Sequence, residues 1–529
     1  MKLFRWAVLL AALSSACAQD SAPGCISCHE QTVKGVHASV ACATCHVKHD
    51  EYPHPENAAK PLCASCHEPI AKLDAQGVHG KAAREGGAAP DCAVCHGPAH
   101  EVKQPKSAEF RAAAIDTCGA CHPDQVGEFK VSVHGRAIEQ GVARAPFCTD
   151  CHGVHSIQPH TSASSPVHPG HVRDTCGSCH GTVALARSFG LPTDRLVSFD
   201  ATFHGLAARG GSQTVANCSS CHGVHNILPS SDAKSTIHPD NLAATCGRCH
   251  PGAGRRFAVG PVHIVEGVRE APAVRWVRNF YLVVIPLVIG LMVLHNLGDW
   301  WRKLRWMRLQ GPIGALPVAA SLETRMLPFE RAQHALLGIS FIVLAWSGFA
   351  LKYPDQWWTR PLLAWESQWP VRSLVHRGAA LLFVAVTVIH LFSLIRSKTL
   401  RDHWRHLLPS RRDVAEARQG FAYNLGLRGT PPARSSHSYI EKAEYWAVVW
   451  GAVVMILTGW MLYANNLMLR LLPKSVLDVV TAIHFYEAVL ATLAIVVWHF
   501  YFVIFDPEVY PMDTAWLTGK SVRKREEHP

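Results

Sequence analysis

The chain has 529 residues, a formal net charge of +11 and 19 cysteines. Residues 19–275 contain 22 Lys and Arg against 23 Asp and Glu, whereas residues 276–529 contain 27 against 17. The basic excess therefore lies in the apolar half, which contains no cysteine. This distribution argues against a nucleic-acid partner and favours a membrane protein, whose cytoplasmic loops are rich in Lys and Arg.

Residues 1–18 have the features of a secretory signal peptide. Lys2 and Arg5 form a basic start, an apolar stretch follows, and small residues flank Cys17. We expect cleavage after residue 18, while lipid modification of Cys17 and an uncleaved anchor stay open as alternatives. In each case residues 19–275 are predicted to be exported to the periplasm.

All the other 18 cysteines belong to nine Cys-x-x-Cys-His motifs. This spacing lets two thiols form thioethers with one haem while the next histidine binds its iron. Zinc sites and disulfides also use paired cysteines, but neither requires a histidine after the second cysteine. We therefore predict nine covalent c-type haems. The attachment cysteines are Cys25, Cys28, Cys42, Cys45, Cys63, Cys66, Cys92, Cys95, Cys118, Cys121, Cys148, Cys151, Cys176, Cys179, Cys218, Cys221, Cys246 and Cys249. The proximal iron ligands are His29, His46, His67, His96, His122, His152, His180, His222 and His250.

An internal repeat of 70 residues relates two copies of a two-haem module, and looser copies precede them. Each module contains a Val/Phe-His pair and a histidine shortly after a motif. These positions supply nine second ligands, so we predict six-coordinate, low-spin iron throughout. The predicted distal ligands are His37, His49, His79, His100, His134, His155, His204, His225 and His263. His54, His168 and His238 remain rival ligands.

Nine haems in residues 19–275 leave roughly 28 residues for each haem. So little protein cannot bury a conventional core, so we expect the haems to form the core, with short helices and loops around them. No Cys-x-x-Cys-Lys variant is present, and the available histidines saturate the irons. The pattern is typical of an electron-conducting array and weighs against an open catalytic iron.

Residues 276–529 contain five apolar stretches of about the length that spans a bilayer. They are residues 279–298, 332–351, 375–395, 445–464 and 480–505. The predicted inner loops and tail contain 20 Lys and Arg, whereas the two outer loops contain 5. The asymmetry predicts a multi-pass bundle in a bacterial inner membrane with a cytoplasmic C-terminus. The predicted fold class is therefore mainly α, with a haem-packed, loop-rich domain followed by a five-helix transmembrane bundle.

Histidines inside membrane spans are costly unless they have a partner. His376 and His390 lie on the third predicted span, and His484 and His499 lie on the fifth, which runs parallel to it. His376 and His484 should therefore share one depth, and His390 and His499 another. The spacing puts two irons about 20 Å apart. His334 competes with His390 as the partner of His499. Histidines that only bridge helices by hydrogen bonds are the alternative, but the matched depths favour two b-type haems.

Two carboxylates are candidate proton relays for a quinol. Glu487 lies within a span, one turn from His484, and Glu444 with Glu441 would serve if the quinone binds at the cytoplasmic side. Helix capping or ion pairing is the alternative role for these carboxylates. The histidines of the basic cytoplasmic segments are expected to be solvated, and they are His403, His406 and His437.

The segments PFERAQHALLGISFIVLAWSGFAL, LVHRGAALLF and AIHFYEAVLATLAIVVWHFYF resemble the dihaem cytochrome b subunits of formate dehydrogenases and nickel-iron hydrogenases. The similarity spans about residues 325–520. It implies that His334 pairs with His499 and His376 with His484, which makes His390 an extra histidine. With the nine-haem domain, the chain resembles the inner-membrane menaquinol dehydrogenases of metal-reducing bacteria.

These features together predict a membrane-bound quinol:cytochrome c oxidoreductase of anaerobic respiration. Electrons would pass from menaquinol through two b haems and nine c haems to a soluble periplasmic c-type cytochrome. The expected partners are membrane lipid, the menaquinone pool and that cytochrome. Three alternatives remain: a quinone reductase fed from periplasmic donors, a terminal reductase of an oxyanion or metal, and a pure electron carrier.

Overall fold

The computed structural model describes Cys25 and residues 29–30, 33–47, 61–252, 254, 262–263, 271–310, 321–366, 370–429 and 437–523. The predicted signal peptide lies outside these residues. Helices dominate the described part, and its one sheet has two antiparallel strands, β1 (Ser321–Thr324) and β2 (Lys520–Arg523). The mainly helical fold class is confirmed.

Short helices make up the cysteine-rich half, and the longest of them has 12 residues. In chain order they are η1 (Gly35–His37), α2 (Cys42–Cys45), η2 (Cys63–Ser65), α3 (Glu68–Gln76), α4 (Val78–Arg84), α5 (Cys92–His96), η3 (Ala99–Glu101), α6 (Ala108–Gly119), α7 (Pro123–Val131), α8 (Val133–Glu139), α9 (Cys148–His152), α10 (Val172–His180), α11 (Val183–Ser188), α12 (Arg195–Asp200), α13 (Phe203–Arg209), α14 (Cys218–His222) and α15 (Leu242–Gly247). Helices α5, α9 and α14 each run from the first cysteine of a motif to its histidine. One helical turn therefore brings both thiols and the imidazole to the same face.

Two Val/Phe-His-Gly segments each begin the second helix of a helical hairpin. One begins α8, which packs against α7, and the other begins α13, which packs against α12. Ser132 and Thr202 cap these helices, because their hydroxyls accept hydrogen bonds of 3.1 Å from the amides of Gly135 and Gly205. A Cβ at either glycine would overlap a carbonyl of the preceding helix. The glycine after the histidine therefore permits the close approach of the two helices.

Residue contacts divide the chain into two compact units. The first contains Met1–Cys179 and Asn217–His238, and the second contains His180–Ala216 and Pro239–Pro529. Helices α12, α13 and α15 thus belong to the same unit as the long C-terminal helices. This division differs from the predicted domain boundary between residues 275 and 276.

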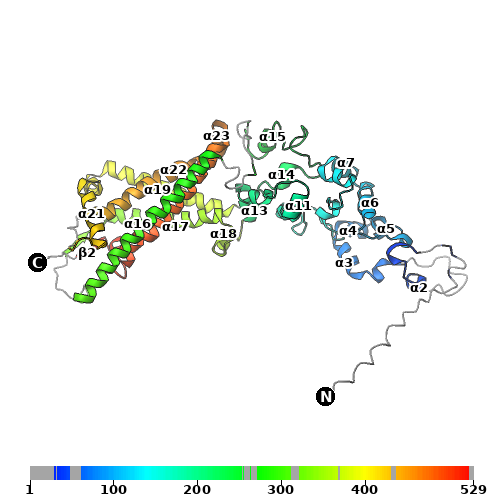
Figure 1. Cartoon of the computed structure of the whole chain (residues 1–529), viewed down its shortest axis with the longest axis horizontal. Helices are drawn as coiled ribbons and strands as arrows, with labels where there is room; N and C mark the ends of the chain where they lie inside the picture. The colour runs from blue at the N-terminus through cyan, green and yellow to red at the C-terminus, as the bar shows by residue number, and fades with distance from the viewer. Residues whose placement is uncertain are drawn as a thin grey trace, which may run out of the picture. The chain divides into compact units, whose positions relative to one another are not determined.

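Within the described residues, five helices are long and apolar enough to cross a membrane: Pro272–Leu309, Pro328–Lys352, Val371–Arg396, Tyr439–Tyr463 and Lys474–Phe505. They correspond to α16 (Pro272–Gln310), α17 (Pro328–Lys352), α19 (Val371–Arg396), α22 (Tyr439–Tyr463) and α24 (Lys474–Ala494) (Figure 1). α17 packs against α19, and α24 packs against both α22 and α16. The prediction of five helices long and apolar enough to span a membrane is confirmed.

α24 continues through two π-helical segments, η7 (Ile495–His499) and η8 (Tyr501–Phe505). The connecting elements of this half are short. They are η5 (Trp357–Thr359), α18 (Arg360–Leu363), α20 (Lys398–Trp404), η6 (Arg405–Leu407), α21 (Arg411–Asn424), α23 (Asn465–Leu471) and α25 (Ala515–Thr518).

A buried ion cluster fastens the segment after η8 to α16. Lys303 is 8% exposed, and its Nζ lies 2.7 Å from Asp299, 2.6 Å from Asp506 and 3.6 Å from Glu508. Tyr501 donates a hydrogen bond of 2.8 Å to Asp299. Burial raises the pKa of Asp506, which the Lys303 ammonium partly offsets. The Lys303 ammonium therefore compensates carboxylates, Asp299 and Asp506, that have little access to water.

Replacing Lys303 with methionine should destabilise the bundle by about 3–5 kcal/mol, because buried carboxylates lose their counter-charge. The matched control is Lys474→Met, which breaks the partly exposed pair with Asp478 (2.9 Å). That control should cost less than about 1 kcal/mol. Thermal unfolding of the purified variants in detergent measures the difference, and equal melting temperatures would contradict the assigned role of Lys303.

Candidate functional site

Six predicted distal histidines each face a motif histidine. The ring-centre distances are 6.1 Å for His37–His67, 6.0 Å for His46–His100, 6.4 Å for His79–His122, 6.1 Å for His96–His155, 6.2 Å for His152–His225 and 6.1 Å for His204–His250. Two imidazoles on opposite sides of one iron, each about 2.0 Å from the metal, place their ring centres roughly 6 Å apart. All six distances suit a shared iron.

The two rings of a pair come from different parts of the chain in a regular alternation. The motif histidines His67, His122 and His250, from motifs three, five and nine, each face the histidine of a Val/Phe-His segment. The histidines of motifs two, four and six each face a histidine that lies just after the next-but-one motif. These pairs are His46 with His100, His96 with His155, and His152 with His225. Each prospective haem site therefore joins neighbouring modules.

Backbone hydrogen bonds reinforce this interlocking. The amide of Val78, beside His79, donates to Ile157 at 2.8 Å, and the amide of Val133 donates to Ile227 at 2.9 Å. In both cases the acceptor lies two residues after a predicted distal histidine. The bond thus ties a Val-His helix to the histidine segment of a later module.

Neighbouring attachment sites also touch. The neighbouring thiol of Cys148 raises the pKa of Cys118, and that of Cys218 raises the pKa of Cys176, so these side chains lie close together. No described cysteine forms a disulfide. Successive motifs therefore place their attachment points side by side, which suits closely packed porphyrins.

The protonation of histidines in the cysteine-rich half also suits metal binding. Burial lowers the pKa of His152 and His204, and their partners His225 and His250 lower it further. Neutral imidazole is the form that binds iron. Burial likewise lowers the pKa of His180.

The other predicted haem residues of the cysteine-rich half are not part of the six facing pairs. Cys28 and His49 lie outside the described residues, whereas His29, His134, His180, His222 and His263 lie within them. The Nδ1 of His263 is 3.1 Å from Ser198 Oγ. The rival His168 accepts a hydrogen bond of 3.2 Å at Nδ1 from the amide of Gly170, so its Nε2 carries the proton. A protonated Nε2 suits a hydrogen-bond donor better than an iron ligand.

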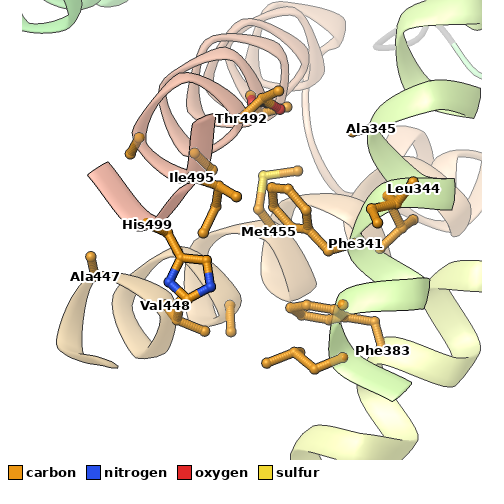
Figure 2. A pocket seen from close by; sticks show the side chains of 18 of the residues that line it. Phe341, Leu344, Ala345, Phe383, Ala447, Val448, Met455, Thr492, Ile495 and His499 are labelled. Carbon is orange, nitrogen blue, oxygen red and sulfur yellow. Dashed lines mark hydrogen bonds between the residues drawn. The ribbon is translucent and has the colours of Figure 1, made fainter. Parts of the chain in front are cut away.

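Two further histidine pairs lie inside the helical bundle. His376 and His484 have ring centres 6.4 Å apart, and His334 and His499 have ring centres 6.2 Å apart. All four rings line one cavity of about 4740 Å³, several times the roughly 300–1,000 Å³ of a common small-molecule pocket. Most of the side chains that Figure 2 labels around His499 are apolar. Phe341, Phe383, Val448, Met455 and Ile495 are among them.

Hydroxyl groups set the orientation of one pair. The Nδ1 of His376 lies 3.0 Å from Ser347 Oγ, and the Nδ1 of His484 lies 2.8 Å from Thr458 Oγ1. Each hydroxyl donates its own proton to a carbonyl one turn earlier in its helix, at 2.6 and 2.7 Å. The hydroxyl must therefore accept from the ring, so Nδ1 carries the proton and Nε2 is left to bind a metal.

Glycines beside these hydroxyls make room for the rings. A Cβ at Gly348 would lie 3.1 Å from His376, and one at Gly459 would lie 3.3 Å from His484. Ser347 with Gly348 on α17, and Thr458 with Gly459 on α22, thus form equivalent supports on two helices. Sequence analysis did not identify them, although a hydroxyl residue followed by glycine in two apolar spans was a usable signal.

His334, rather than His390, faces His499. Both ring nitrogens of His390 have other partners, since they lie 3.3 Å from Gln333 Oε1 and 3.3 Å from Tyr445 OH.

His499 belongs to the π-helical segment η7, where each turn holds an extra residue. This extra residue lets His499 face the cavity although it lies 15 residues after His484, one more than the spacing of His376 and His390.

The candidate proton relays have different surroundings. Glu444 lines the cavity, and its Oε2 lies 3.2 Å from His499 Nδ1. Its Oε1 is buried without a hydrogen-bond partner. Glu487 is 6% exposed, accepts a hydrogen bond of 2.7 Å from Tyr281 on α16, and does not line the cavity. Glu441 also lines the cavity and is paired with Arg325 at 2.5 Å.

The expectation that the histidines of the basic segments are solvated is wrong for two of them. His403 and His437 are partly buried and line the cavity. His403 Nδ1 lies 2.9 Å from Glu330, and the ring of His437 lies 5.9 Å from that of His403. The sequence did not reveal the grouping of Glu330, His403 and His437, because these residues belong to segments that meet only in the folded bundle.

A family model described as prokaryotic cytochrome b561 matches residues 325–514. No curated protein matches the chain. The matched residues include all four paired histidines of the bundle. This region is therefore similar to a membrane-spanning, haem-binding b-type cytochrome that takes part in electron transfer.

Proposed function

We propose that the chain is a membrane-bound quinol:cytochrome c oxidoreductase that takes electrons from menaquinol and delivers them to a soluble periplasmic cytochrome. The observation that carries the proposal is the set of facing histidines, two pairs in the bundle and six in the exported half, all 6.0–6.4 Å apart. Such pairs would hold haems, which supply reversible one-electron chemistry. The match to a b-type cytochrome supports the membrane part of this assignment.

In this proposal His376 and His484 hold one b haem, and His334 and His499 hold the other. The Nδ1 contacts of His376, His484 and His499 support it, because each leaves Nε2 directed to a metal. His390 is held by Gln333 and Tyr445 and is not a ligand. The apolar side chains beside His499 would shield a bound haem from water.

The nine motifs would hold nine c haems with histidine on both sides of each iron. Six pairs of rings support this assignment directly. The unassigned motif histidines and the unassigned predicted ligands are equal in number, three of each. A fully six-coordinate array favours electron transfer over reduction of an oxyanion or a metal at an open iron.

Oxidation of a quinol releases protons, and Glu444 is the proposed acceptor. Its Oε1 is buried and lacks a hydrogen-bond partner, while its Oε2 lies 3.2 Å from His499 Nδ1. A carboxylate in this position can take a proton from a hydroxyl while His499 holds its other oxygen. Glu487 is less suited, because Tyr281 on another helix occupies its carboxylate.

The location follows from the same features. The predicted signal peptide would export residues 19–275 to the periplasm of a bacterium, and the five membrane-capable helices would anchor the chain in the inner membrane. The excess of Lys and Arg in the predicted inner loops supports a cytoplasmic C-terminus.

A direct test uses the purified full-length protein under anaerobic conditions with a menaquinol analogue. We expect the b absorption bands to be reduced first, the c bands to follow, and a soluble c-type cytochrome to reoxidise them. Reduction of neither band would overturn the proposal. Electron delivery only to a menaquinone analogue would favour the reverse direction, and high-spin paramagnetic resonance signals would favour a terminal reductase.

The b-haem ligands predict a contrast between two alanine variants. His334→Ala should lose one of two non-covalent haems, because His499 then has no partner across the iron. His390→Ala should keep both, since its ring contacts only Gln333 and Tyr445. A pyridine haemochrome assay counts covalent and non-covalent haem separately. Loss of haem b in His390→Ala, or its retention in His334→Ala, would contradict this assignment.

Thr458→Val should weaken haem b binding by about 10–100-fold, the usual effect of losing the group that orients a metal-bound histidine. The matched control is Thr492→Val, because Thr492 also lines the cavity and bonds a carbonyl one turn earlier at 2.7 Å. Titration of haem into the protein after removal of its b haem measures the affinity. Equal affinities in the two variants would show that Thr458 has no part in orienting His484.

A further inference from the structure

Helix α13, which carries His204, packs against α17 within the second compact unit. Both His204 and His250 line the cavity of the bundle, together with His376 and His484. Of the six facing pairs in the described part of the exported half, this pair alone has both rings in that lining. The His204–His250 site therefore opens onto the bundle interior.

Arg372 lies where α13, α17 and α19 meet. It is 1% exposed and occupies the first turn of α19, one turn before His376 on the same helix face. Its Nη1 donates to the carbonyl of Ala350 on α17 at 3.0 Å, and its Nη2 lies 3.3 Å from Glu366 Oε1 and 3.5 Å from the Leu206 carbonyl on α13. One buried guanidinium thus contacts the helices that carry ligands of two different sites.

Gly210, at the end of α13, packs directly against this guanidinium. Its φ of −76° is open to any residue, so the glycine is not needed for a turn. A Cβ at Gly210 would instead overlap the guanidinium of Arg372. Beside it, Arg209 forms an ion pair with Asp355. The missing side chain at Gly210 therefore lets α13 sit close against α19.

The other ligand of this site is held by α23. The Nδ1 of His250 lies 3.0 Å from Asn466 Oδ1, an acceptor, so the ring donates there and keeps Nε2 for a metal. Arg470 donates to the carbonyl of Pro251 at 3.1 Å. Residues of the bundle therefore orient His250 and contact the helix that carries His204.

We propose that electrons leave the bundle through the His204–His250 site, and that Arg372 is the positioning residue that holds this site beside the His376–His484 pair. The inference rests on the proposed electron transfer from b haem to c haem and adds the place where it occurs. Transfer between two cofactors depends steeply on their separation, so a small displacement of α13 should slow it. Arg372 suits this role because its planar fork donates to several acceptors at once, while Glu366 balances its charge away from water.

The test compares Arg372→Gln with Arg401→Gln in the full-length holoprotein. Arg401 also donates to carbonyls of α19, but at the opposite end of that helix. After mixing with a menaquinol analogue, Arg372→Gln should reduce its b bands at the parent rate and its c bands at least tenfold more slowly. Hydrogen exchange of the amides in α13 should become faster in the same variant. Arg401→Gln should match the parent in both measurements.

A second variant approaches the contact from the other side. Gly210→Val keeps Arg372 itself but places a Cβ on its Nη2, the atom that contacts Glu366 and the Leu206 carbonyl, so slower c-band reduction and faster exchange are again expected. This variant keeps the test decisive if Arg372→Gln does not fold.

The outcomes separate the two proposals. If quinol fails to reduce the b bands of the parent, the proposed function is at fault. Parent-like c-band reduction and unchanged α13 protection in Gly210→Val, with b bands reduced normally, would overturn the role of this contact.

Discussion

The structure of this protein depends on one repeated unit, a pair of facing imidazoles whose separation leaves space for a single iron atom. In the cysteine-rich half, few apolar side chains are buried among the described residues, and they include Ile115, Val126, Phe147 and Phe199. Isolated helices of 12 residues or fewer are only marginally stable in water. Ligands from separate modules would bind each haem from both sides, so binding of the haem and folding of the chain are the same event. Because the two ligands of each pair come from different modules, haem binding at one site would also help to fold the next module.

Inside the bundle the same unit must be built from groups that a membrane disfavours. A histidine between apolar helices is costly unless its nitrogens are satisfied. The hydroxyls of Ser347 and Thr458 satisfy one nitrogen of each ring. Each hydroxyl accepts a hydrogen bond from the imidazole and donates its own to a backbone carbonyl of its helix. The adjoining glycines provide the space. Two helix pairs, α17 with α19 and α22 with α24, thus support one site in matching ways.

The His204–His250 pair connects these two environments. Its ligands come from the cysteine-rich sequence, while its orientation depends on Arg372, Asn466 and Arg470 of the membrane half. The contact division reflects this, since α13 and α15 group with the bundle.

Much of the site could be read from residue spacing. Cysteine and histidine spacing is local chemistry, so nine attachment motifs are visible without a fold, and apolar runs long enough for a bilayer indicate five spans because length alone sets that limit. Pairing could not be read in this way. Helical spacing allowed both His334 and His390 as the partner of His499, and the choice depends on Gln333 and Tyr445, which engage His390 from other helices. The π-helical turn at His499, the hydroxyl supports and the contact of Gly210 with Arg372 also arise between segments far apart in the chain. Such features depend on side chains meeting across helices, and their energies are a property of the packed bundle rather than of any one stretch of sequence.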